Sequence, residues 1–243
     1  MSAPTAAAPR AATRILSFDV GLRHLAYAVL SVSDAAEGVG GAPGRQLALD
    51  RWGVLDIAAA AEEERRRSRG TPASDALTTA LVTVLDREFY DPGAVSYDHV
   101  LIENQPSRKN PSMKAIQVAI HTYFATLRLY AGCVGQVRLV SATQKLLPMA
   151  TAASAAPSPS AAPPAVLLAG AAYRERKARS IEMCRRFLAE DLRDEAASAQ
   201  LAAARKKDDL CDALLQAVWF VSTLSEGEVP KKGVRAPGKG SKK

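Results

Sequence analysis

Two carboxylates stand at the ends of short apolar segments. Asp19 lies near the end of Arg14–Val20, and the Gly21 that follows has no side chain, which lets a backbone or a phosphate approach closely. Glu103 closes the segment His99–Glu103. Burying a bare carboxylate is costly, so each acid needs a hydrogen bond, an ion pair or a metal ion. A turn-capping role for Asp19 and a structural salt bridge for Glu103 are the alternative interpretations.

A second pair of carboxylates lies toward the C-terminal end of the chain. Asp209 and Asp212 are three residues apart at the start of an apolar helical pattern, so they share one face of that helix. Acids in a first helical turn are also favoured by the helix dipole. That effect accounts for Asp208, but it explains Asp212 poorly because Asp212 lies deeper among the apolar positions.

Together these acids predict metal-dependent chemistry. Several carboxylates that meet in one place repel one another unless cations lie between them. Oxygen ligands alone select hard ions, so we expect Mg²⁺, with Mn²⁺ as a substitute, and two ions per site. Two such ions about 4 Å apart activate a water and stabilise the leaving oxygen at a phosphodiester. The predicted catalytic residues and metal ligands are Asp19, Glu103, Asp209 and Asp212.

The pattern of apolar residues and turn residues predicts an α/β order of elements. The predicted strands are Arg14–Val20 and Leu25–Val32, which read as a β-hairpin, then Gln46–Ile57, His99–Glu103 and Gly135–Val140. The predicted helices are Asp75–Glu88, Pro111–Tyr130, Ala171–Leu192 and Leu201–Leu224, and the charged run Glu62–Gly70 is expected to be a solvated loop or a frayed helix. This order predicts a mixed central β-sheet flanked by helices.

Composition excludes some classes of protein. The chain has no uninterrupted apolar span of the roughly 20 residues that a transmembrane helix needs, so we expect no role in a membrane. Its three cysteines form no CxxC pair, which argues against a disulfide framework or a zinc ribbon and favours a reducing intracellular compartment.

The positive charge is concentrated at the C-terminal end. The last thirteen residues, Lys231–Lys243, carry five Lys and one Arg and no acid. Removing these six charges from the formal net charge of +7 leaves +1 for the rest of the chain. A flexible basic tail of this kind is a common non-specific anchor for nucleic acid, and a solubilising or targeting tail is the alternative.

Three ordered motifs carry a specific resemblance. They are Ser17–Tyr27 (SFDVGLRHLAY), Ile102–Pro106 (IENQP) with Asn110–Lys114 (NPSMK), and Lys206–Asp212 (KKDDLCD). In these motifs the chain resembles the Holliday junction resolvases of poxviruses and other large DNA viruses, which are relatives of bacterial RuvC and of fungal mitochondrial resolvases. The resemblance spans about Arg14–Leu224.

The resemblance implies an RNase H-like fold, a homodimer, Mg²⁺ and a catalytic set that falls on the four acids named above. The expected organisation is a disordered leader (1–13), an RNase H-like resolvase domain (14–224) with a disordered Ala/Ser/Pro insertion (150–166), and a flexible basic tail (225–243). A Gly-rich insertion lies at 37–44.

Basic residues supply the expected DNA contacts. The loop after Glu103 carries amides and cations suited to phosphate oxygens, and the helix pattern at Arg174–Arg186 is densely basic. Lys145 and Lys177 lie where the resembled family tends to carry DNA-contacting residues. The expected DNA-binding residues are Arg108, Lys109, Lys114, Lys145, Arg174, Arg176, Lys177 and Arg179.

These observations predict a structure-specific endodeoxyribonuclease that resolves four-way DNA junctions by paired, metal-dependent phosphodiester hydrolysis. One alternative is a general RNase H-like nuclease acting on RNA/DNA hybrids, flaps or other branched DNA. Another is a catalytically silent DNA-binding protein, which the complete set of four acids argues against. The expected location is a viral replication site in the host cytoplasm or nucleus. The mitochondrion is the alternative, because a leader rich in Ala and Pro, with Arg10 and Arg14 and no acid, is similar to a short transit peptide.

Overall fold

Within the described residues, the central sheet has five strands of mixed direction. The computed structural model describes residues 12–34, 45–70, 72–90, 97–108, 110–141 and 168–225. The strands are β1 (Thr13–Val20), β2 (His24–Asp34), β3 (Arg45–Asp56), β4 (Tyr97–Glu103) and β5 (Val134–Val140). They lie in the order β3-β2-β1-β4-β5, with β2 antiparallel to β1 and β3, and β4 parallel to β1 and β5. The predicted α/β class, a mixed central sheet flanked by helices, is confirmed.

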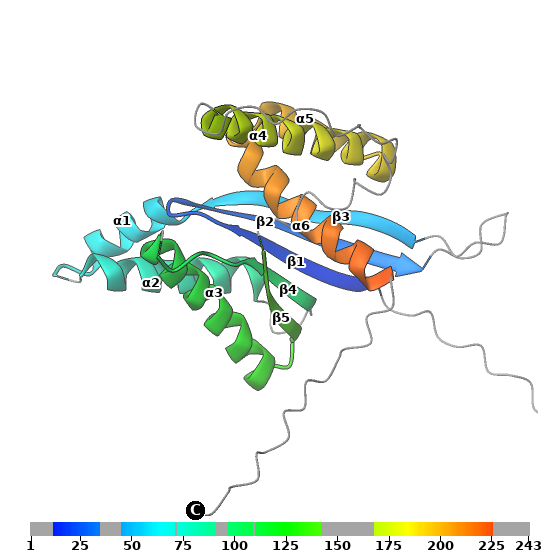
Figure 1. Cartoon of the computed structure of the whole chain (residues 1–243). Coiled ribbons are helices and arrows are strands. Elements are labelled where there is room, and N and C mark those ends of the chain that lie inside the picture. The colour runs from blue at the N-terminus through cyan, green and yellow to red at the C-terminus, as the bar shows by residue number, and fades with distance from the viewer. Residues whose placement is uncertain are drawn as a thin grey trace, which may run out of the picture.

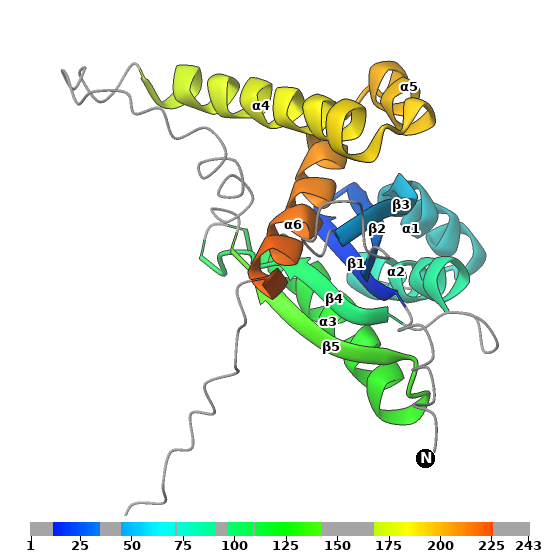
Figure 2. The ribbon, with the colours of Figure 1, turned by 90° about the vertical axis from the view of Figure 1, so that its right-hand side faces the viewer.

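Helices cover both faces of this sheet (Figures 1 and 2). They are α1 (Ile57–Arg67), α2 (Ala73–Phe89), α3 (Pro111–Tyr130), α4 (Leu168–Arg186), α5 (Glu195–Ala203) and α6 (Lys207–Ser225), and a π-helical segment η2 (Phe187–Leu192) continues α4. In Figure 1, α4, α5 and α6 lie on one side of the sheet and α1, α2 and α3 on the other. The fold therefore has three layers.

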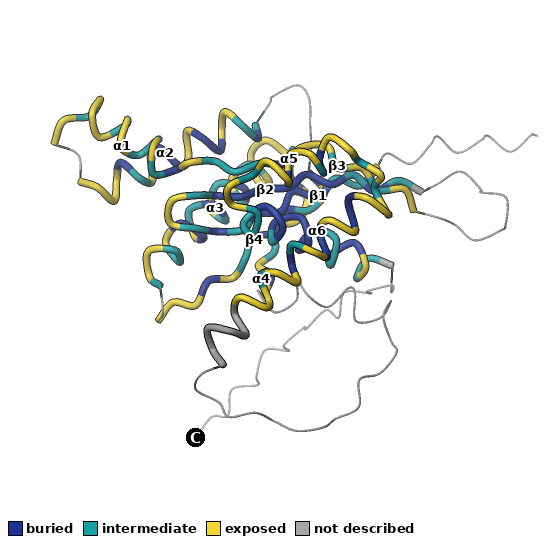
Figure 3. Tube along the Cα trace, turned by 90° about the horizontal axis from the view of Figure 1, so that it is seen from above, coloured by how far each residue is buried: buried dark blue, intermediate teal, exposed yellow. Residues whose placement is uncertain are grey.

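Alternation along β1 divides the core into two clusters. Ile15 belongs to the cluster that joins the sheet to α4, α5 and α6, whereas Leu16 and Phe18 belong to the cluster shared with α2 and α3. Because successive side chains of a strand point to opposite faces, odd-numbered residues of β1 face α6. The strands at the centre of the sheet are buried along most of their length, while α1 and the ends of α3 are exposed (Figure 3).

The sequence prediction of one helix over Leu201–Leu224 is wrong, because two helices occupy this region. Ala204 adopts an extended conformation, and its backbone N–H donates to the carbonyls of Gln200 and Leu201 to close α5. The new helix α6 then starts at Lys207. The helix predicted over Ala171–Leu192 begins earlier than expected, at 168, and ends in η2.

The charged run expected as a loop or frayed helix is mostly regular helix. Asp56 caps the start of α1 by accepting a hydrogen bond from the Ala59 N–H at 2.9 Å. Within α1, Arg65 pairs with Glu62 at 3.3 Å, and side-chain pairs one turn apart stabilise a helix. Only the three residues that follow α1, Ser68 to Gly70, form a turn.

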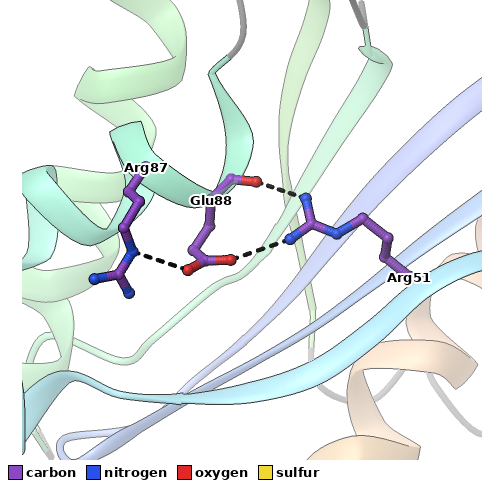
Figure 4. Close-up of polar contacts among 3 residues, drawn as sticks. All are labelled: Arg51, Arg87 and Glu88. Atoms are coloured by element: carbon purple, nitrogen blue, oxygen red, sulfur yellow. Dashed lines mark hydrogen bonds and ion pairs between the residues drawn. The ribbon is translucent and has the colours of Figure 1, made fainter.

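An arginine ties the edge strand β3 to the end of α2 (Figure 4). Arg51 donates to the Glu88 backbone carbonyl at 2.6 Å and to the Glu88 carboxylate at 3.1 Å, and Arg87 donates to the same carboxylate at 3.0 Å. The Arg51 guanidinium also lies 5.6 Å from the centre of the Tyr27 ring and 5.5 Å from that of Phe89. A cation at a helix C-terminus and over aromatic faces is favourable, so Arg51 fastens β3 against the α2 layer.

The apolar stripe of α3 is part of the core. Ile116, Ile120 and Phe124 are buried in the cluster beneath α2 and α3, and Leu127 packs against it. These side chains therefore serve core packing within the chain. Among the described residues, Cys133, Cys184 and Cys211 are all free thiols. No described helix is both long and apolar enough to span a bilayer.

Several predicted segments lie outside the described residues. They are most of the leader (1–11), the Gly-rich insertion, the Ala/Ser/Pro insertion and the basic tail beyond 225.

Candidate active site

Strand geometry places the first two predicted acids side by side. The last paired residues of the parallel strands β1 and β4 are Phe18 and Ile102, and Asp19 and Glu103 each follow by one residue. On β4, Leu101 packs toward α6 while Ile102 packs toward α3, so odd-numbered residues of β4 also face α6. Asp19 and Glu103 therefore lie at the same end and on the same face of the sheet.

Helix α6 brings the second pair of acids to this face. Gln216 lies one and two turns beyond Asp212 and Asp209 and is fully buried. Its side-chain N–H donates to the Ser17 hydroxyl at 3.0 Å and to the Phe18 carbonyl at 3.2 Å, directly before Asp19. The side-chain amide oxygen of Gln216 is buried without a partner among the described residues. This bridge sets α6 against the strand that carries the first acid.

All four predicted acids line one open hollow of about 610 Å³. Its floor and rim are formed by the turn between β1 and β2, the end of β4, and side chains of α3, α4 and α6. The lining residues are Asp19, Val20, Gly21, Leu22, Arg23, His24, Glu103, Gln105, Met113, Lys177, Lys206, Asp208, Asp209 and Asp212. The structure thus brings together residues that are up to 193 positions apart in the sequence.

The pKa values of two neighbouring acids of the hollow, Asp208 and Asp209, shift in opposite directions. Burial raises the pKa of Asp209, and the negative charges of Asp208 and Asp19 raise it further. Burial alone would also raise the pKa of Asp208, but the hydrogen bond and the positive charge of Lys177 outweigh it, and the pKa of Asp208 is lowered. The negative charge of Asp208 is therefore balanced by the positive charge of Lys177. Asp209 is repelled by other acids, as expected where carboxylates converge.

Helix α4 supports the acids of α6 from one side. The buried Ser180 hydroxyl donates to the Asp212 carboxylate at 2.9 Å, and one turn earlier Lys177 pairs with Asp208. Sequence analysis missed Ser180, because a single serine in a basic helix has no distinctive pattern. It assigned Lys177 to DNA, whereas the structure places this side chain half-buried in the hollow.

On the opposite side, an amide holds Glu103. Gln105, which is only 7% exposed, donates from its side-chain nitrogen to the Glu103 carboxylate at 2.9 Å and to the Val20 carbonyl at 3.4 Å. Its own backbone N–H donates to the Gln117 side chain of α3 at 2.8 Å. The loop after β4 is thus pinned both to the end of β1 and to α3.

The turn between β1 and β2 forms a rigid part of the rim. A side chain at Gly21 would bring its Cβ within 2.5 Å of the His24 carbonyl oxygen, so the turn requires glycine. The Arg23 carbonyl accepts from the N–H groups of Ile57 and Ala58 at the start of α1. Arg23 and Lys206, which are both exposed, place two positive charges along the hollow that sequence analysis missed.

His24, the first residue of β2, is half-buried and lines the hollow, with its Nε2 4.0 Å from the Asp56 carboxylate.

Apart from Lys177, which lines the hollow, the predicted DNA contacts divide into three groups. Lys114 is engaged inside the protein, donating to Asn104 at 3.2 Å and to Gln117 at 3.1 Å. Lys109 and Lys145 lie outside the described residues. The exposed members are Arg108, Arg174, Arg176 and Arg179, the last three on α4.

The donor chemistry of the hollow fits a hard divalent cation, because carboxylates from β1, β4 and α6 line the hollow. Within the described part of the chain, no three His, Cys, Asp or Glu side chains lie close enough together to form a ready coordination sphere. Burial and then the negative charges of Asp208 and Asp19 raise the pKa of Asp209, and this repulsion opposes a closer approach of these acids without a cation.

Comparisons with known proteins agree in part with the sequence resemblance. Residues 15–126 match the model of a family described as mitochondrial resolvase Ydc2 / RNA splicing MRS1, a stretch that includes Asp19 and Glu103 but ends before Asp209. A Thermus thermophilus RuvC structure is 15% identical with a TM-score of 0.44, over 87% of this chain and 96% of that one. T. thermophilus RuvC in complex with a Holliday junction substrate is 15% identical with a TM-score of 0.44, over 88% and 97%. Curated protein sequences give no match.

Proposed function

We propose that the protein is a divalent-metal-dependent endonuclease that resolves four-way DNA junctions. The observation that carries the proposal is the convergence of Asp19, Glu103, Asp209 and Asp212 on one open hollow with cations at its rim. The resolvase family model that matches residues 15–126 supports the same assignment. The four carboxylates would hold Mg²⁺ in this hollow.

The residues of the chain have separate roles in this proposal. Divalent cations bound between the four acids would supply Lewis acidity at the scissile phosphodiester and an activated water. Arg23 and Lys206 would offset the repulsion between the acids and the incoming phosphates. The exposed arginines of α4 would contact the duplex backbone beyond the hollow. An open, solvent-facing site is required because duplex DNA is too wide to enter an enclosed cavity.

We further propose a homodimer as the active unit. One site of this kind hydrolyses one phosphodiester, yet resolving a junction requires cuts in two strands of like polarity. A two-fold dimer presents two sites in the relation that the symmetry of the junction demands. The matched family is described as mitochondrial, which favours the mitochondrial location over a viral replication site.

Substitution of the acids tests the active site. Asp19→Asn, Glu103→Gln, Asp209→Asn and Asp212→Asn each remove a ligand charge with little change of shape. We expect cleavage of a four-way junction to fall by at least about 100-fold in each variant while junction binding persists, because binding comes from Lys and Arg. Cleavage and binding are measured on the same preparations by gel assay.

Asp208→Asn is the matched control, since Asp208 lines the same hollow but is paired with Lys177. Its effect on cleavage should be milder than that of any of the four. An Asp209 or Asp212 variant that cuts at the wild-type rate would remove that residue from the site. Loss of junction binding in step with cleavage would instead favour a general structural defect.

A further inference from the structure

The Glu103 carboxylate has a specific support that is separate from the acids themselves. Gln105 lies two residues beyond Glu103 and lines the same hollow. Its side-chain nitrogen has two neighbours, the Glu103 carboxylate and the Val20 carbonyl, both of which can only accept hydrogen bonds. The orientation of the amide is therefore fixed by chemistry, with its N–H groups toward the acid.

The Gln105 amide is itself held on a rigid frame. The Gln105 backbone N–H donates to the Gln117 oxygen, and that same oxygen accepts from the Lys114 ammonium at 3.1 Å. Gln117 is buried at 2% exposure on α3, and the Asn104 N–H donates to the Val140 carbonyl of β5 at 2.7 Å. Helix α3 and strand β5 thus fix the loop from which Gln105 reaches back to Glu103.

We infer that Gln105 is a positioning residue that sets the orientation of the Glu103 carboxylate toward a bound divalent cation. The inference rests on the proposed function. A carboxylate on a flexible side chain can rotate, and the other acids of the hollow repel it. A hydrogen bond to one of its oxygens fixes its plane before the cation arrives, which lowers the entropy lost on binding. The second bond, to Val20, ties this orientation to the strand that carries Asp19.

The test compares Gln105→Met with the wild-type full chain. Methionine keeps the length of the side chain but donates no hydrogen bond. We expect the dissociation constant for Mg²⁺, measured by calorimetry, to rise by about 10- to 100-fold, the usual effect of removing a partner of a metal ligand. The Mg²⁺ concentration for half-maximal cleavage should rise in parallel, while affinity for the junction in EDTA stays unchanged. Gln105→Asn, which keeps an amide but is too short to reach both acceptors, should behave in the same way.

Gln200→Met is the matched control. Gln200 also donates a side-chain amide bond, to the Trp52 carbonyl at 2.9 Å, but it does not line the hollow. It should lower the melting temperature without changing Mg²⁺ affinity. The inference is overturned if both Gln105 variants bind Mg²⁺ as the wild type does, or if Gln200→Met weakens Mg²⁺ binding equally. If Gln105→Met weakens Mg²⁺ binding but the wild type cuts no junction, the inference stands and the proposed function fails.

Discussion

Gly21 lies in a turn that leaves no room for a side chain. Gly21→Ala would place a Cβ 2.5 Å from the His24 carbonyl oxygen, and backbone must move to relieve the contact. We expect a loss of about 1–3 kcal/mol in the free energy of unfolding, the usual range for overpacking. Because the same turn follows Asp19 on the rim of the hollow, cleavage should fall further than stability explains. Urea unfolding and junction cleavage of the variant check the two effects, and an unchanged midpoint would contradict the predicted clash.

We expect the stability of the fold to depend on pH through His99. Burial lowers the pKa of His99 from its ordinary value of 6.5, and the nearby positive charge of Arg138 lowers it further. Its ring lies 4.8 Å from that of Phe220. As the pH falls through 6.5, the unfolded chain binds a proton at His99 that the folded chain does not, so this residue lowers the stability of the fold.

Urea unfolding of wild type and His99→Gln between pH 8 and pH 5 measures this contribution. Between these pH values the wild type should lose more of its free energy of unfolding than the variant, since the glutamine at position 99 of the variant does not titrate. The remaining histidines are common to both proteins and cancel in the comparison. Parallel stability curves would show that His99 is not responsible.

The acids of the hollow could be predicted from the sequence, but their supports could not. Asp19 and Glu103 are recognisable because each interrupts an apolar strand, and such a strand allows few other positions for a charge. Gln216 contacts Ser17 across 199 residues of sequence, and a lone amide in a helix has no periodic pattern. Gln105 stood within a recognised motif, yet only the structure shows that its amide faces Glu103.

At the scale of elements, the edge strand β3 holds two helices in place. The buried Trp52 of β3 donates from its indole nitrogen to the Leu210 carbonyl of α6 at 2.9 Å. The Trp52 backbone carbonyl accepts from Gln200 of α5 at 2.9 Å. Gln200 and Leu210, which lie on either side of the break between α5 and α6 in the sequence, thus both bond to Trp52. No Gly or Pro marks the break in the sequence, so local propensity predicted one continuous helix.

Trp52→Phe should therefore loosen α6. The substitution removes the hydrogen bond to Leu210 and part of a buried ring, and we expect a loss of about 1–3 kcal/mol in the free energy of unfolding by urea. Trp219→Phe is the matched control, because Trp219 is half-buried on α6 and its indole nitrogen makes no hydrogen bond in the described part of the chain. An equal loss in both variants would show that ring volume, and not the bond, matters.

At the scale of the whole molecule, the acids of the hollow lie beside a basic helix surface. The acids converge at one end of the sheet, and exposed arginines lie on α4 next to them. This arrangement suits a polyanion whose backbone contacts the arginines while one phosphate enters the acidic hollow, where a bound cation would meet it. The α/β class with a mixed sheet was predictable from the order of elements. The packing of α4 on α6 was not, because it depends on contacts such as that between Ser180 and Asp212.

Cleavage of defined substrates by the purified full chain tests the central claim most directly. The substrates are a four-way junction, a linear duplex of the same sequence and an RNA/DNA hybrid, each with Mg²⁺ and with EDTA. The account predicts paired, symmetric nicks in the junction with 5′-phosphate and 3′-hydroxyl ends that a ligase seals, slow cutting of the duplex and hybrid, and no cutting in EDTA. Digestion of the duplex or the hybrid as fast as of the junction would contradict junction resolution and leave a general nuclease, and cutting in EDTA would contradict the metal-dependent site.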